Sequence, residues 1–470
     1  MTPPAANESA LPASFGEPAI PFLQRTFSWR ANLDFLRSPN MALLGAGLLL
    51  PNVLSLATLG SFIDVGLPPR TGCILLYAIL AVCARRLPFA LTAILFIALL
   101  SFDMVFTLSL MFGLAPSELL VALDHAKRIN FFASPLYISL IAVMLTTTAA
   151  TLYMLSRRAK LLQGNIYLLL GVTVVIAGLD FVTNVSAHYQ YGSMFGRNVP
   201  VVSAADVSGF NAVAGTNGRN VVLVVVESLG YMIDPKDRAL IDSPLSDPRI
   251  AQKYKVTSGT ATYYGSTTAG EMRELCHTRK FYADYAPKYG FSCLPELLHR
   301  RGYESVALHA FSGGMFERKF WYPRLGFDKE IFGQQILKQT HRMCGGAFRG
   351  ACDADMAPVI VNAAKRLGPT DRPRFIYWLT LNTHIPVEPG DARTHFDCAG
   401  LGNPFHQGTV CRMAELWHDF FNTLTQVALD PTIGPAEILV VGDHAPPLWS
   451  KRGRSMFEAG KVAWYRLTPR

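Results

Sequence analysis

The sequence has 470 residues, of which 50% are hydrophobic and only 16% charged, and its formal net charge is +9. This composition excludes a single soluble domain, and the apolar excess lies before about residue 185. Many basic residues flank apolar segments and no basic–aromatic motif accompanies them. The charge therefore argues against nucleic acid and favours a partner with anionic head groups, such as a phospholipid.

Five apolar stretches are long enough to cross or nearly cross a bilayer, for which a helix needs about 20 residues. They are residues 41–63, 67–84, 88–114, 132–156 and 165–183. Arg70 and Arg85 bound the second stretch closely, so it spans only if both side chains snorkel to the membrane surfaces. Asp103 and Asp180 lie within apolar stretches, where acidic residues are functional candidates by default. The pattern predicts an α-helical membrane bundle of about five transmembrane helices.

Basic clusters lie on one side of these stretches. They are Arg25, Arg30 and Arg37 before the first stretch, Arg85 and Arg86 after the second, and Arg157, Arg158 and Lys160 after the fourth. With five spans, the positive-inside rule makes that side cytoplasmic. Everything after about residue 185 is then expected on the far side of the membrane.

Composition divides the chain into a cytoplasmic tail (1–40), the bundle (41–185), a glycine-containing linker without periodicity (186–218) and a soluble domain (219–470). In the last part, predicted strands alternate with predicted helices. The strands are 221–226, 304–310, 375–381 and 437–441, and the helices are 295–301, 353–367 and 412–428. This alternation predicts an α/β sandwich around a mostly parallel sheet.

Six of the eight cysteines follow residue 185, which agrees with an oxidising location outside the cytoplasm. Several connectivities are open to six cysteines. Proximity along the chain favours Cys276–Cys293, Cys344–Cys352 and Cys398–Cys411. No CxxC or HxxxH pair occurs among them, so disulfides are favoured over a zinc site.

Two apolar runs end abruptly in residues that ligate metals. Residues 220–226 are followed by Glu227, and residues 438–442 are followed by Asp443 and His444. Continuous apolar runs are typical of strands in a parallel sheet that is covered on both faces. Ligands collect beyond the carboxyl ends of such strands. A single capped strand is common, but the two together predict a metal-assisted phosphoryl-transfer site.

Between these runs, residues 264–276 have the sequence YGSTTAGEMRELC. A hydroxyl residue followed by Gly and Glu is first of all a helix N-terminus signature, with Thr267 or Thr268 as the N-cap. A hydroxyl in that place also faces the positive end of the helix dipole, where an anion binds well. Beside a divalent cation its pKa would fall, and it would become a nucleophile.

Glu227 after a valine-rich strand, Thr267 in its loop and residues 442–444 at a strand end resemble the alkaline phosphatase/sulfatase superfamily. Within it, the chain resembles the membrane-bound lipoteichoic acid synthase and periplasmic glucan phosphoglycerol transferase family. That resemblance implies five transmembrane helices followed by an extracytoplasmic sulfatase-like domain. The nucleophilic Thr of these enzymes is followed by Gly three residues on, or by Glu four residues on, with a Cys further along. Thr267 fits this spacing, and Thr268 does not.

Two more segments match the family. His309 and Arg318, within residues 308–328, resemble its strand-end His and its Phe-Trp-Asn-Arg segment, and His384, within residues 381–386, resembles its Ser/Thr-x-His-x-Pro turn. The resemblance implies that these three residues bind the substrate. Taken without it, His309 is equally a core histidine, His384 a loop histidine, and Arg318 part of a solvated charged run. Arg is nevertheless the side chain that binds phosphate in a bidentate manner.

The resemblance implies a catalytic Thr267 and one divalent ion held by Glu227, Thr267, Asp443 and His444. Three oxygen ligands and one nitrogen favour Mn²⁺, with Mg²⁺ and Zn²⁺ as alternatives. The implied reaction transfers phosphoglycerol from phosphatidylglycerol to an envelope glycan or polymer, at the periplasmic face of a bacterial inner membrane. Residues 316–317 (Phe-Glu) stand where the synthases have Trp-Asn, and this departure bears on the head group and the acceptor.

Three other functions are open. Phosphoethanolamine transferases acting on lipid A or glycan have a similar layout, but they usually show Gly-Glu-Thr where this chain has Glu227-Ser228. A catalytically silent membrane-anchored scaffold would keep the fold without turnover, although all four metal-type ligands are present. A simple sulfatase is disfavoured, because the Cys/Ser-x-Pro-x-Arg signature is missing around Thr267.

Overall fold

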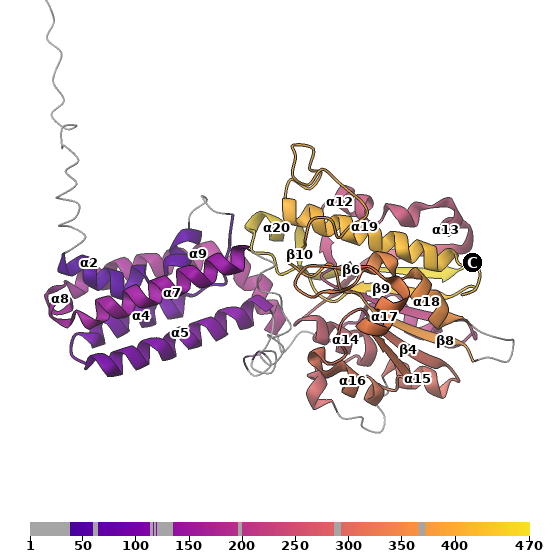
Figure 1. Ribbon diagram of the computed structural model, residues 1–470, viewed down its shortest axis with the longest axis horizontal. Coiled ribbons are helices and arrows are strands. Elements are labelled where there is room, and N and C mark those ends of the chain that lie inside the picture. The colour runs from indigo at the N-terminus through magenta and orange to yellow at the C-terminus, as the bar shows by residue number, and fades with distance from the viewer. Residues whose placement is uncertain are drawn as a thin grey trace, which may run out of the picture.

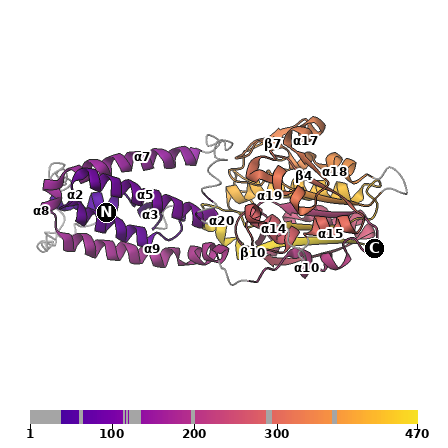
Figure 2. The ribbon, with the colours of Figure 1, turned by 90° about the horizontal axis from the view of Figure 1, so that it is seen from below.

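The computed structural model describes residues 38–59, 64–112, 116, 119, 135–195, 200–285, 293–365 and 372–470. In these residues a bundle of long helices leads into an α/β domain built on one large sheet (Figures 1 and 2). This agrees with the predicted order of a helical membrane region followed by an α/β domain. Most of the predicted cytoplasmic tail, including its three arginines, lies outside the described residues.

The bundle is built from apolar helices that run along its length (Figure 2). They are α2 (Pro39–Leu44), η1 (Gly45–Leu49), α3 (Val53–Thr58), α4 (Thr71–Ala84), α5 (Phe89–Phe112), α7 (Pro135–Ser156), α8 (Arg158–Gln163) and α9 (Ile166–Phe195). Among the described residues, three segments are long and apolar enough to cross a membrane: Phe89–Met111, Tyr137–Ser156 and Ile166–Asn184. The first two predicted spans form shorter apolar helices, Pro39–Leu49 and Thr71–Ala84.

A buried ionic network joins α4, α5 and α9. The Arg70 guanidinium pairs with both carboxylate oxygens of Asp103, and its Nη1 donates to Ser55 Oγ (2.6 Å). Asp180 accepts from the Arg70 backbone N–H (2.9 Å) and from Thr71 Oγ1 (2.8 Å) at the start of α4. Arg70 is only 7% exposed, so its side chain does not snorkel, and the condition under which the second stretch was expected to span is not met at this residue. The 14 residues of α4 span only about 21 Å, and Arg70 immediately precedes the helix. Because α4 is this short, it begins inside the bundle. Arg70 is therefore away from water there, and its charge needs an acidic partner.

The sheet of the α/β domain has the strand order β2-β10-β9-β1-β8-β4-β5, and β3 also pairs with β10. Its central pairs are parallel, whereas β10 is antiparallel to β9, β2 and β3. The strands are β1 (Val221–Val226), β2 (Gly230–Met232), β3 (Tyr254–Thr262), β4 (Glu304–His309), β5 (Lys329–Phe332), β8 (Arg374–Leu379), β9 (Glu437–Gly442) and β10 (Phe457–Pro469). A small ribbon pairs β6 (Met343–Cys344) with β7 (Gly350–Ala351). The four predicted strands are present, and the antiparallel edge was not predicted.

Helices cover both faces of this sheet. The helices are α12 (Pro235–Ile241), α13 (Pro248–Lys253), α14 (Thr267–Cys276), α15 (Leu294–Arg300), α16 (Arg318–Trp321), α17 (Gly333–Thr340), α18 (Ala357–Ala364), α19 (Gly408–Leu429) and α20 (Lys451–Ser455). Short 3₁₀ turns are η4 (Ser243–Ser246), η5 (Tyr282–Asp284), η6 (Met315–Glu317), η7 (Pro323–Leu325) and η8 (Asp353–Asp355). Alternate residues of β1 point to opposite faces. Val222 and Val224 join the core that contains α18 and α19, while Val221 and Leu223 join the core that contains α14 and α15.

The predicted linker is partly structured. Helix α9 continues to Phe195, and two short helices follow, α10 (Ala204–Val207) and α11 (Phe210–Val213). The side chains of Ala204 and Phe210 are fully buried in the core of the α/β domain. The backbone N–H groups at the start of α10 donate to the Glu274 carboxylate, which ties this segment to α14.

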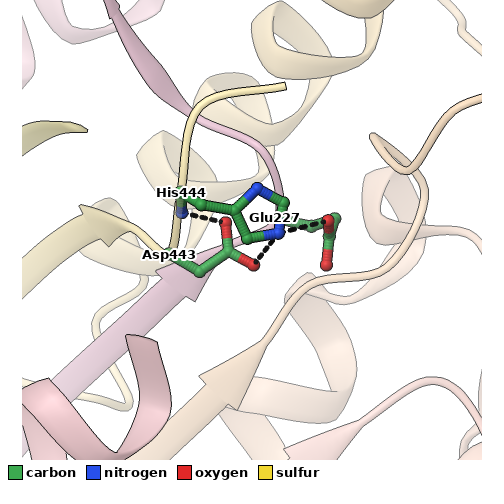
Figure 3. A group of neighbouring side chains, drawn as sticks. All are labelled: Glu227, Asp443 and His444. Carbon is green, nitrogen blue, oxygen red and sulfur yellow. Dashed lines mark hydrogen bonds and ion pairs between the residues drawn. The ribbon is translucent and has the colours of Figure 1, made fainter. Parts of the chain in front are cut away.

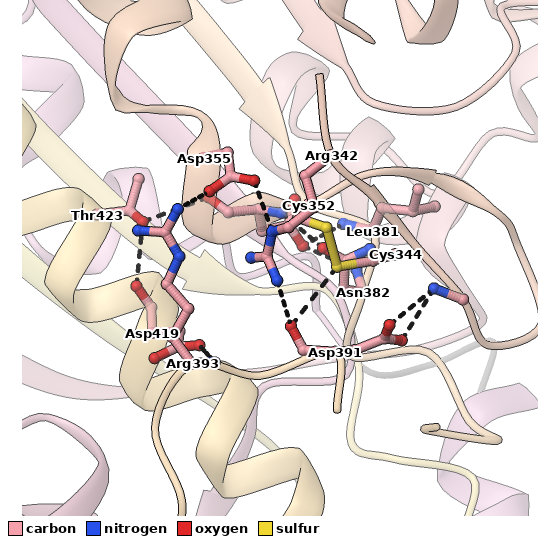
Figure 4. Close-up of a disulfide and its surroundings, with 12 residues drawn as sticks. Arg342, Cys344, Cys352, Asp355, Leu381, Asn382, Asp391, Arg393, Asp419 and Thr423 are labelled. Carbon is pink, nitrogen blue, oxygen red and sulfur yellow. Dashed lines mark hydrogen bonds and ion pairs between the residues drawn. A yellow bond between two sulfur atoms is a disulfide. The ribbon is translucent and has the colours of Figure 1, made fainter. Parts of the chain in front are cut away.

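All three predicted disulfide pairings are confirmed: Cys276–Cys293, Cys344–Cys352 and Cys398–Cys411. Figure 4 shows the Cys344–Cys352 bridge beside a group of charged side chains. There Asp355 accepts from Arg342 Nε (2.8 Å) and pairs with Arg393. The bridge closes a loop of the α/β domain, and these ion pairs fix its base.

Residues 449–454, which follow the predicted metal ligand His444, form hydrogen bonds with the helical bundle. The Gly66 backbone N–H donates to the Trp449 carbonyl (2.8 Å), and the Arg452 N–H donates to Asp64 Oδ1 (3.0 Å). Lys451 Nζ donates to the carbonyl of Thr58 (2.7 Å), at the end of α3. We call this contact of residues 449–454 with residues 58–59 and 64–66 the clasp.

The buried pair in the bundle gives a first prediction. In Asp103→Leu, the Arg70 charge is left without its partner, and breaking a buried pair in this way costs about 3–5 kcal/mol. The double variant Arg70→Met/Asp103→Leu removes both charges and is expected to recover most of that loss. Thermal unfolding in detergent measures both, and equal instability of the single and double variants would contradict the prediction.

Candidate active site

The carboxyl ends of β1 and β9 bring the predicted ligands together. The two strands pair in parallel, with Val226 opposite Gly442, so Glu227 and Asp443 are the first residues beyond neighbouring strand ends. The Asp443 backbone N–H donates to the Val226 carbonyl (3.1 Å), which carries the pairing one residue further. Figure 3 shows the His444 imidazole between the two carboxylates.

The distances define a compact three-residue cluster. His444 Nε2 lies 3.5 Å from Glu227 Oε1 and 3.3 Å from Asp443 Oδ2. The other ring nitrogen, Nδ1, is 2.9 Å from the carbonyl of Ala445. A carbonyl accepts only, so Nδ1 carries a proton, and neutral His444 then directs the lone pair of Nε2 at the carboxylates. One ligand atom from each of the three residues lies within 4.8 Å of the others.

Burial of two carboxylates together shifts their proton affinities. Burial raises the pKa of Asp443 to about 7, and the charge of Glu227 adds to the rise. Burial opposes ionisation of Glu227 as well, but the His444 and His384 imidazoles lower its pKa below the ordinary value. Against the effect of burial, the two carboxylates raise the pKa of His444. The cluster therefore needs positive charge, supplied by a proton or by a cation.

The donor set fits a divalent cation. Asp443 Oδ1 accepts the backbone N–H groups of Ser228 (2.7 Å) and His444 (2.6 Å). Its other oxygen, Oδ2, is buried and has no hydrogen-bond partner among the described residues. The cluster thus offers a buried, unpartnered carboxylate oxygen, a second carboxylate and an imidazole lone pair. Together these groups can act as ligands for Mn²⁺, Mg²⁺ or Zn²⁺.

Thr267 is the fourth member of this group. It is the first residue of α14, whose N-cap is Ser266 and not Thr267 or Thr268 as predicted. Thr267 Oγ1 donates to Glu227 Oε2 (3.1 Å) and lies 3.4 Å from His444 Nε2. Its hydroxyl thus faces the ligand cluster at the positive end of a ten-residue helix.

Close packing of α14 against the end of β9 explains Gly270. A Cβ on Gly270 would lie 2.9 Å from Asp443 Cα, so a larger residue would push the helix away. Arg273, one turn further, donates to the carbonyls of Asp443 (3.0 Å) and Gly442 (2.8 Å) and pairs with Glu274. These contacts hold Thr267 and Asp443 in a fixed relation.

Arg318 lies near the site, and Glu271 holds its guanidinium. Arg318 Nη2 and Nε donate to Glu271 Oε2 (2.8 and 3.1 Å), and Tyr322 and Tyr377 donate to the other carboxylate oxygen. Burial opposes the Arg318 charge, but Glu271 raises its pKa, so the side chain stays cationic. With Nη1 on the Met315 carbonyl, three of its five N–H groups have partners among the described residues. Two N–H groups remain for an anion.

Residues 316–317, where the sequence departs from the synthases, have an unusual backbone. Phe316 and Glu317 have φ angles of 50° and 56°, in the left-handed region that non-glycine residues seldom adopt. Such strain is concentrated at functional sites. The Phe316 ring lies under the Arg318 guanidinium, with Cζ 5.4 Å from the ring centroid.

Of the two remaining predicted histidines, His309 is buried and His384 is half-buried, and each has Nδ1 against a backbone carbonyl. His309 Nδ1 is 3.2 Å from the Leu379 carbonyl, and His384 Nδ1 is 2.8 Å from the Ile385 carbonyl. Burial lowers the pKa of both, and Arg318 lowers that of His309 further. Both rings are therefore neutral near pH 7, and each offers the lone pair of Nε2.

The turn 380–384 supports both Glu227 and His384. Thr380 Oγ1 accepts the Glu227 backbone N–H (2.9 Å), and Thr383 donates to the Glu227 carbonyl. Asp353, 5% exposed, anchors this turn through the N–H groups of residues 381 and 382 (2.9 and 2.7 Å). Phe348, from the loop closed by Cys344–Cys352, packs edge-on against His384 with ring centroids 4.5 Å apart.

A cavity of about 540 Å³ connects the site to the bundle. Its walls in the α/β domain include six of the seven predicted site residues: Glu227, Thr267, His309, Arg318, His384 and His444. Asp443 lies behind them. On the other side, α5 and α7 contribute apolar walls. The predicted site residues thus face one continuous space that extends toward the membrane.

Comparison with known proteins is consistent with this geometry. The sulfatase family profile matches residues 219–399, from the start of β1 to beyond the turn 380–384. Residues 219–399 of the chain are therefore similar to the sulfatase family, as the resemblance implies. No curated protein matches the sequence.

Three solved structures are similar to part of this chain. The lipoteichoic acid synthase LtaP from Listeria monocytogenes is 16% identical, with a TM-score of 0.40 over 53% of this chain and 65% of that one. This chain thus covers less than two thirds of LtaP. The Streptococcus pyogenes phosphoglycerol transferase GacH, in complex with sn-glycerol-1-phosphate, is 16% identical, with a TM-score of 0.37 over 61% and 75%. The periplasmic domain of EptC from Escherichia coli, in complex with Zn, is 14% identical, with a TM-score of 0.35 over 55% and 74%.

Sequence reasoning missed two supporting acids. Glu271 was noted only for its spacing from Thr267, because its partner Arg318 is 47 residues away. Asp353 was placed at the start of a predicted helix, and nothing in the sequence pairs it with the turn 28–29 residues downstream. No local pattern in the sequence links either acid to its distant partner.

A metal-binding prediction follows from the cluster. The purified protein is expected to bind one divalent ion per chain, and Asp443→Asn should weaken binding by more than about tenfold, since loss of even an outer partner of a metal ligand costs that much. Equilibrium dialysis against Mn²⁺ with elemental analysis measures this. Asp397→Asn, which changes an exposed carboxylate, is the matched control, and equal metal content in all three proteins would contradict the prediction.

Asp353 gives a pH prediction. Burial raises its pKa to about 7. The pKa of Asp in the unfolded chain is lower, about 3.9. Between about pH 4 and pH 7 the folded protein therefore holds a proton on Asp353 that the unfolded chain has lost. The free energy of unfolding consequently falls as the pH rises through that range. Asp353→Asn, the neutral isostere, should therefore lose less thermal stability than the wild type between pH 5 and pH 8. Parallel melting curves for both proteins would refute this assignment.

Proposed function

We propose that this chain transfers phosphoglycerol from phosphatidylglycerol to a hydroxyl of an envelope glycan or polymer, through a phospho-Thr267 intermediate. The observation that carries the proposal is the cavity that joins Thr267 to the apolar walls of α5 and α7. A phospholipid has a phosphate for one end of this space and hydrocarbon for the other. A water-soluble donor would gain nothing from walls that lie within membrane-type helices.

Glu227, Thr267, Asp443 and His444 are proposed to hold the divalent ion, with Mn²⁺ favoured. When bound, it supplies Lewis acidity, which lowers the pKa of a hydroxyl and neutralises phosphoryl charge. The chain itself contributes the position of Thr267 Oγ1, fixed by its hydrogen bond to Glu227 Oε2. It also contributes the free backbone N–H groups in the first turn of α14, which favour an anion.

In the first half-reaction, Thr267 Oγ attacks phosphorus in line with the diacylglycerol oxygen. The Oγ–P bond forms, and the bond from phosphorus to the diacylglycerol oxygen breaks. The proton lost by Thr267 is balanced by the proton gained by diacylglycerol. In the second half-reaction, the oxygen of an acceptor hydroxyl attacks phosphorus, so that the bond from the acceptor oxygen to phosphorus forms and the Thr267 Oγ–P bond breaks. The proton lost by the acceptor hydroxyl balances the proton gained by Thr267 Oγ.

The neutral histidines have roles that follow from their tautomers. His384 Nε2 carries a lone pair, and the half-buried side chain lines the same cavity as Glu227, so it is suited to take the proton of the acceptor hydroxyl. His309 Nε2 is likewise an acceptor, and it suits a hydroxyl of the glycerol head group better than a phosphate oxygen. The two free N–H groups of Arg318 suit the non-bridging oxygens.

The cellular setting is part of the same proposal. Five helices cross the inner membrane, and the catalytic domain lies in the periplasm. The three disulfides support this location, since an oxidising compartment maintains them. The clasp supports a site held at the membrane surface, where lipid donors are concentrated and capture from bulk water is unnecessary.

Intact-mass analysis tests the nucleophile and the donor together. The full-length protein is incubated with Mn²⁺ and phosphatidylglycerol, without an acceptor, and is expected to gain one glycerophosphate on Thr267 with release of diacylglycerol. Thr267→Ala should form no adduct. A fully active Thr267→Ala enzyme would rule the mechanism out.

Two comparisons sharpen this test. Phosphatidylethanolamine is offered in parallel and should give no adduct. A phosphoethanolamine adduct on Thr267 would mean that the donor is phosphatidylethanolamine, with the mechanism unchanged. Thr268→Ala changes the neighbouring hydroxyl and is the matched control, expected to form the adduct normally. No adduct and no diacylglycerol from either lipid would favour the silent scaffold.

A further inference from the structure

We propose that the space between α5 and α7 is a binding slot for one acyl chain of a phospholipid, drawn from the leaflet next to the catalytic domain. The proposal rests on the proposed function, because it places the phosphate of the donor at Thr267. It adds where the hydrocarbon of that donor lies and how it enters.

Each helix presents one stripe of side chains to the slot. The stripes are Leu100, Asp103, Met104, Thr107, Leu108 and Met111 on α5, and Tyr137, Leu140, Ile141, Met144 and Thr147 on α7. Spacings of three and four residues place each set on one helix face. Both threonine hydroxyls donate within their own helices, to Asp103 and to the Val143 carbonyl. The wall between the catalytic site and Asp103 is therefore apolar.

The slot is about as deep as one membrane leaflet. At a rise of about 1.5 Å per residue, the stripe on α5 from Met111 to Asp103 is about 12 Å long, and the stripe on α7 from Tyr137 to Thr147 is about 15 Å long. Met111 and Tyr137 lie near the helix ends that face the catalytic domain. The hydrocarbon core of a bilayer is about 30 Å thick. A chain from the adjacent leaflet thus matches the slot in depth.

The inner end of the slot is polar. Arg70 and Asp103 both line it, and their ion pair is buried, with exposures of 7% and 3%. Entry of hydrocarbon beyond this point would bring methylene groups against buried charges. The ion pair therefore marks the floor of the slot, which gives these intramembrane residues a role beyond capping α4.

The slot opens sideways into the membrane. Met104 and Ile141 line it and remain 38% and 46% exposed, so the slot is open to its surroundings at these positions. Exposed positions on membrane-crossing helices contact lipid, so an acyl chain can enter between α5 and α7 without leaving apolar surroundings. The whole cavity, about 540 Å³, is within the range of about 300–1,000 Å³ typical of ligand sites, whereas packed interiors contain few voids larger than a water molecule.

Blocking the slot tests the proposal. Met144→Trp fills it from α7, while Leu145→Trp places the same ring on the outer face, where Leu145 is 62% exposed and does not line the cavity. Each methylene group of the acyl chain that the Trp side chain keeps out of the slot and in water lowers the affinity for the lipid about fourfold. With long-chain phosphatidylglycerol in phosphatidylcholine vesicles, Met144→Trp should lower the kcat/KM of diacylglycerol release about tenfold or more. Leu145→Trp should match the wild type within about twofold.

A short-chain donor separates a blocked slot from a damaged enzyme. Phosphatidylglycerol with two four-carbon chains does not need the slot, so Met144→Trp should process it at about the wild-type rate. Equal losses with both donors, or equal losses in Met144→Trp and Leu145→Trp, would overturn the proposal.

Cross-linking tests the slot independently of turnover. Phosphatidylglycerol with a diazirine in the middle of one chain is photolysed with the Thr267→Ala protein in vesicles. Adducts are expected on the slot stripes of α5 and α7, and adducts confined to outward-facing residues would overturn the slot. If adducts form on the stripes but wild-type Thr267 gains no glycerophosphate, the slot is supported and the proposed transfer reaction is refuted. Failure of the slot can therefore be told apart from failure of the proposed function.

Discussion

Glu227 and Asp443 lie side by side, away from water, where two neighbouring parallel strands end, and His444 lies between them. Two buried carboxylates repel each other and lose hydration, so this arrangement is costly unless positive charge compensates it. The surroundings reduce that cost only in part. Backbone N–H groups satisfy one oxygen of Asp443, and Ser228 Oγ donates to Glu227 Oε1 (2.9 Å). The unsatisfied remainder is the reason that the cluster could hold a divalent cation.

The structure around this cluster is organised to keep it rigid. Helix α14 approaches Asp443 closely because Gly270 has no side chain, and Arg273 holds the two carbonyls at the end of β9. On the other side, the turn 380–384 grips the backbone of Glu227, and Asp353 and the loop of Cys344–Cys352 hold that turn and His384. Rigid support of this kind lets a site stabilise developing charge without reorganising.

Contact between the two parts of the chain then relates the site to the membrane. The clasp follows His444 by only a few residues, so the segment that carries a proposed ligand also holds the end of α3 and the start of the path to α4. The cavity shared by both parts runs from Thr267 to Arg70 and Asp103. An ionic network inside the bundle and the Glu227–Asp443–His444 cluster outside it therefore bound the same space. The proposed lipid donor would use both ends of that space.

Local sequence alone determined the elements whose signal is local. Apolar runs in 221–226 and 437–441 predicted strands, the residues after them predicted a ligand cluster, and short spacings predicted the three disulfides. Tertiary structure decided what depends on distant partners. Arg70 pairs with Asp103 instead of snorkelling, Glu271 holds Arg318, and Asp353 anchors the turn 380–384. The slot between α5 and α7 also belongs to this second group, because helical periodicity shows which residues share a face but not which helix that face meets.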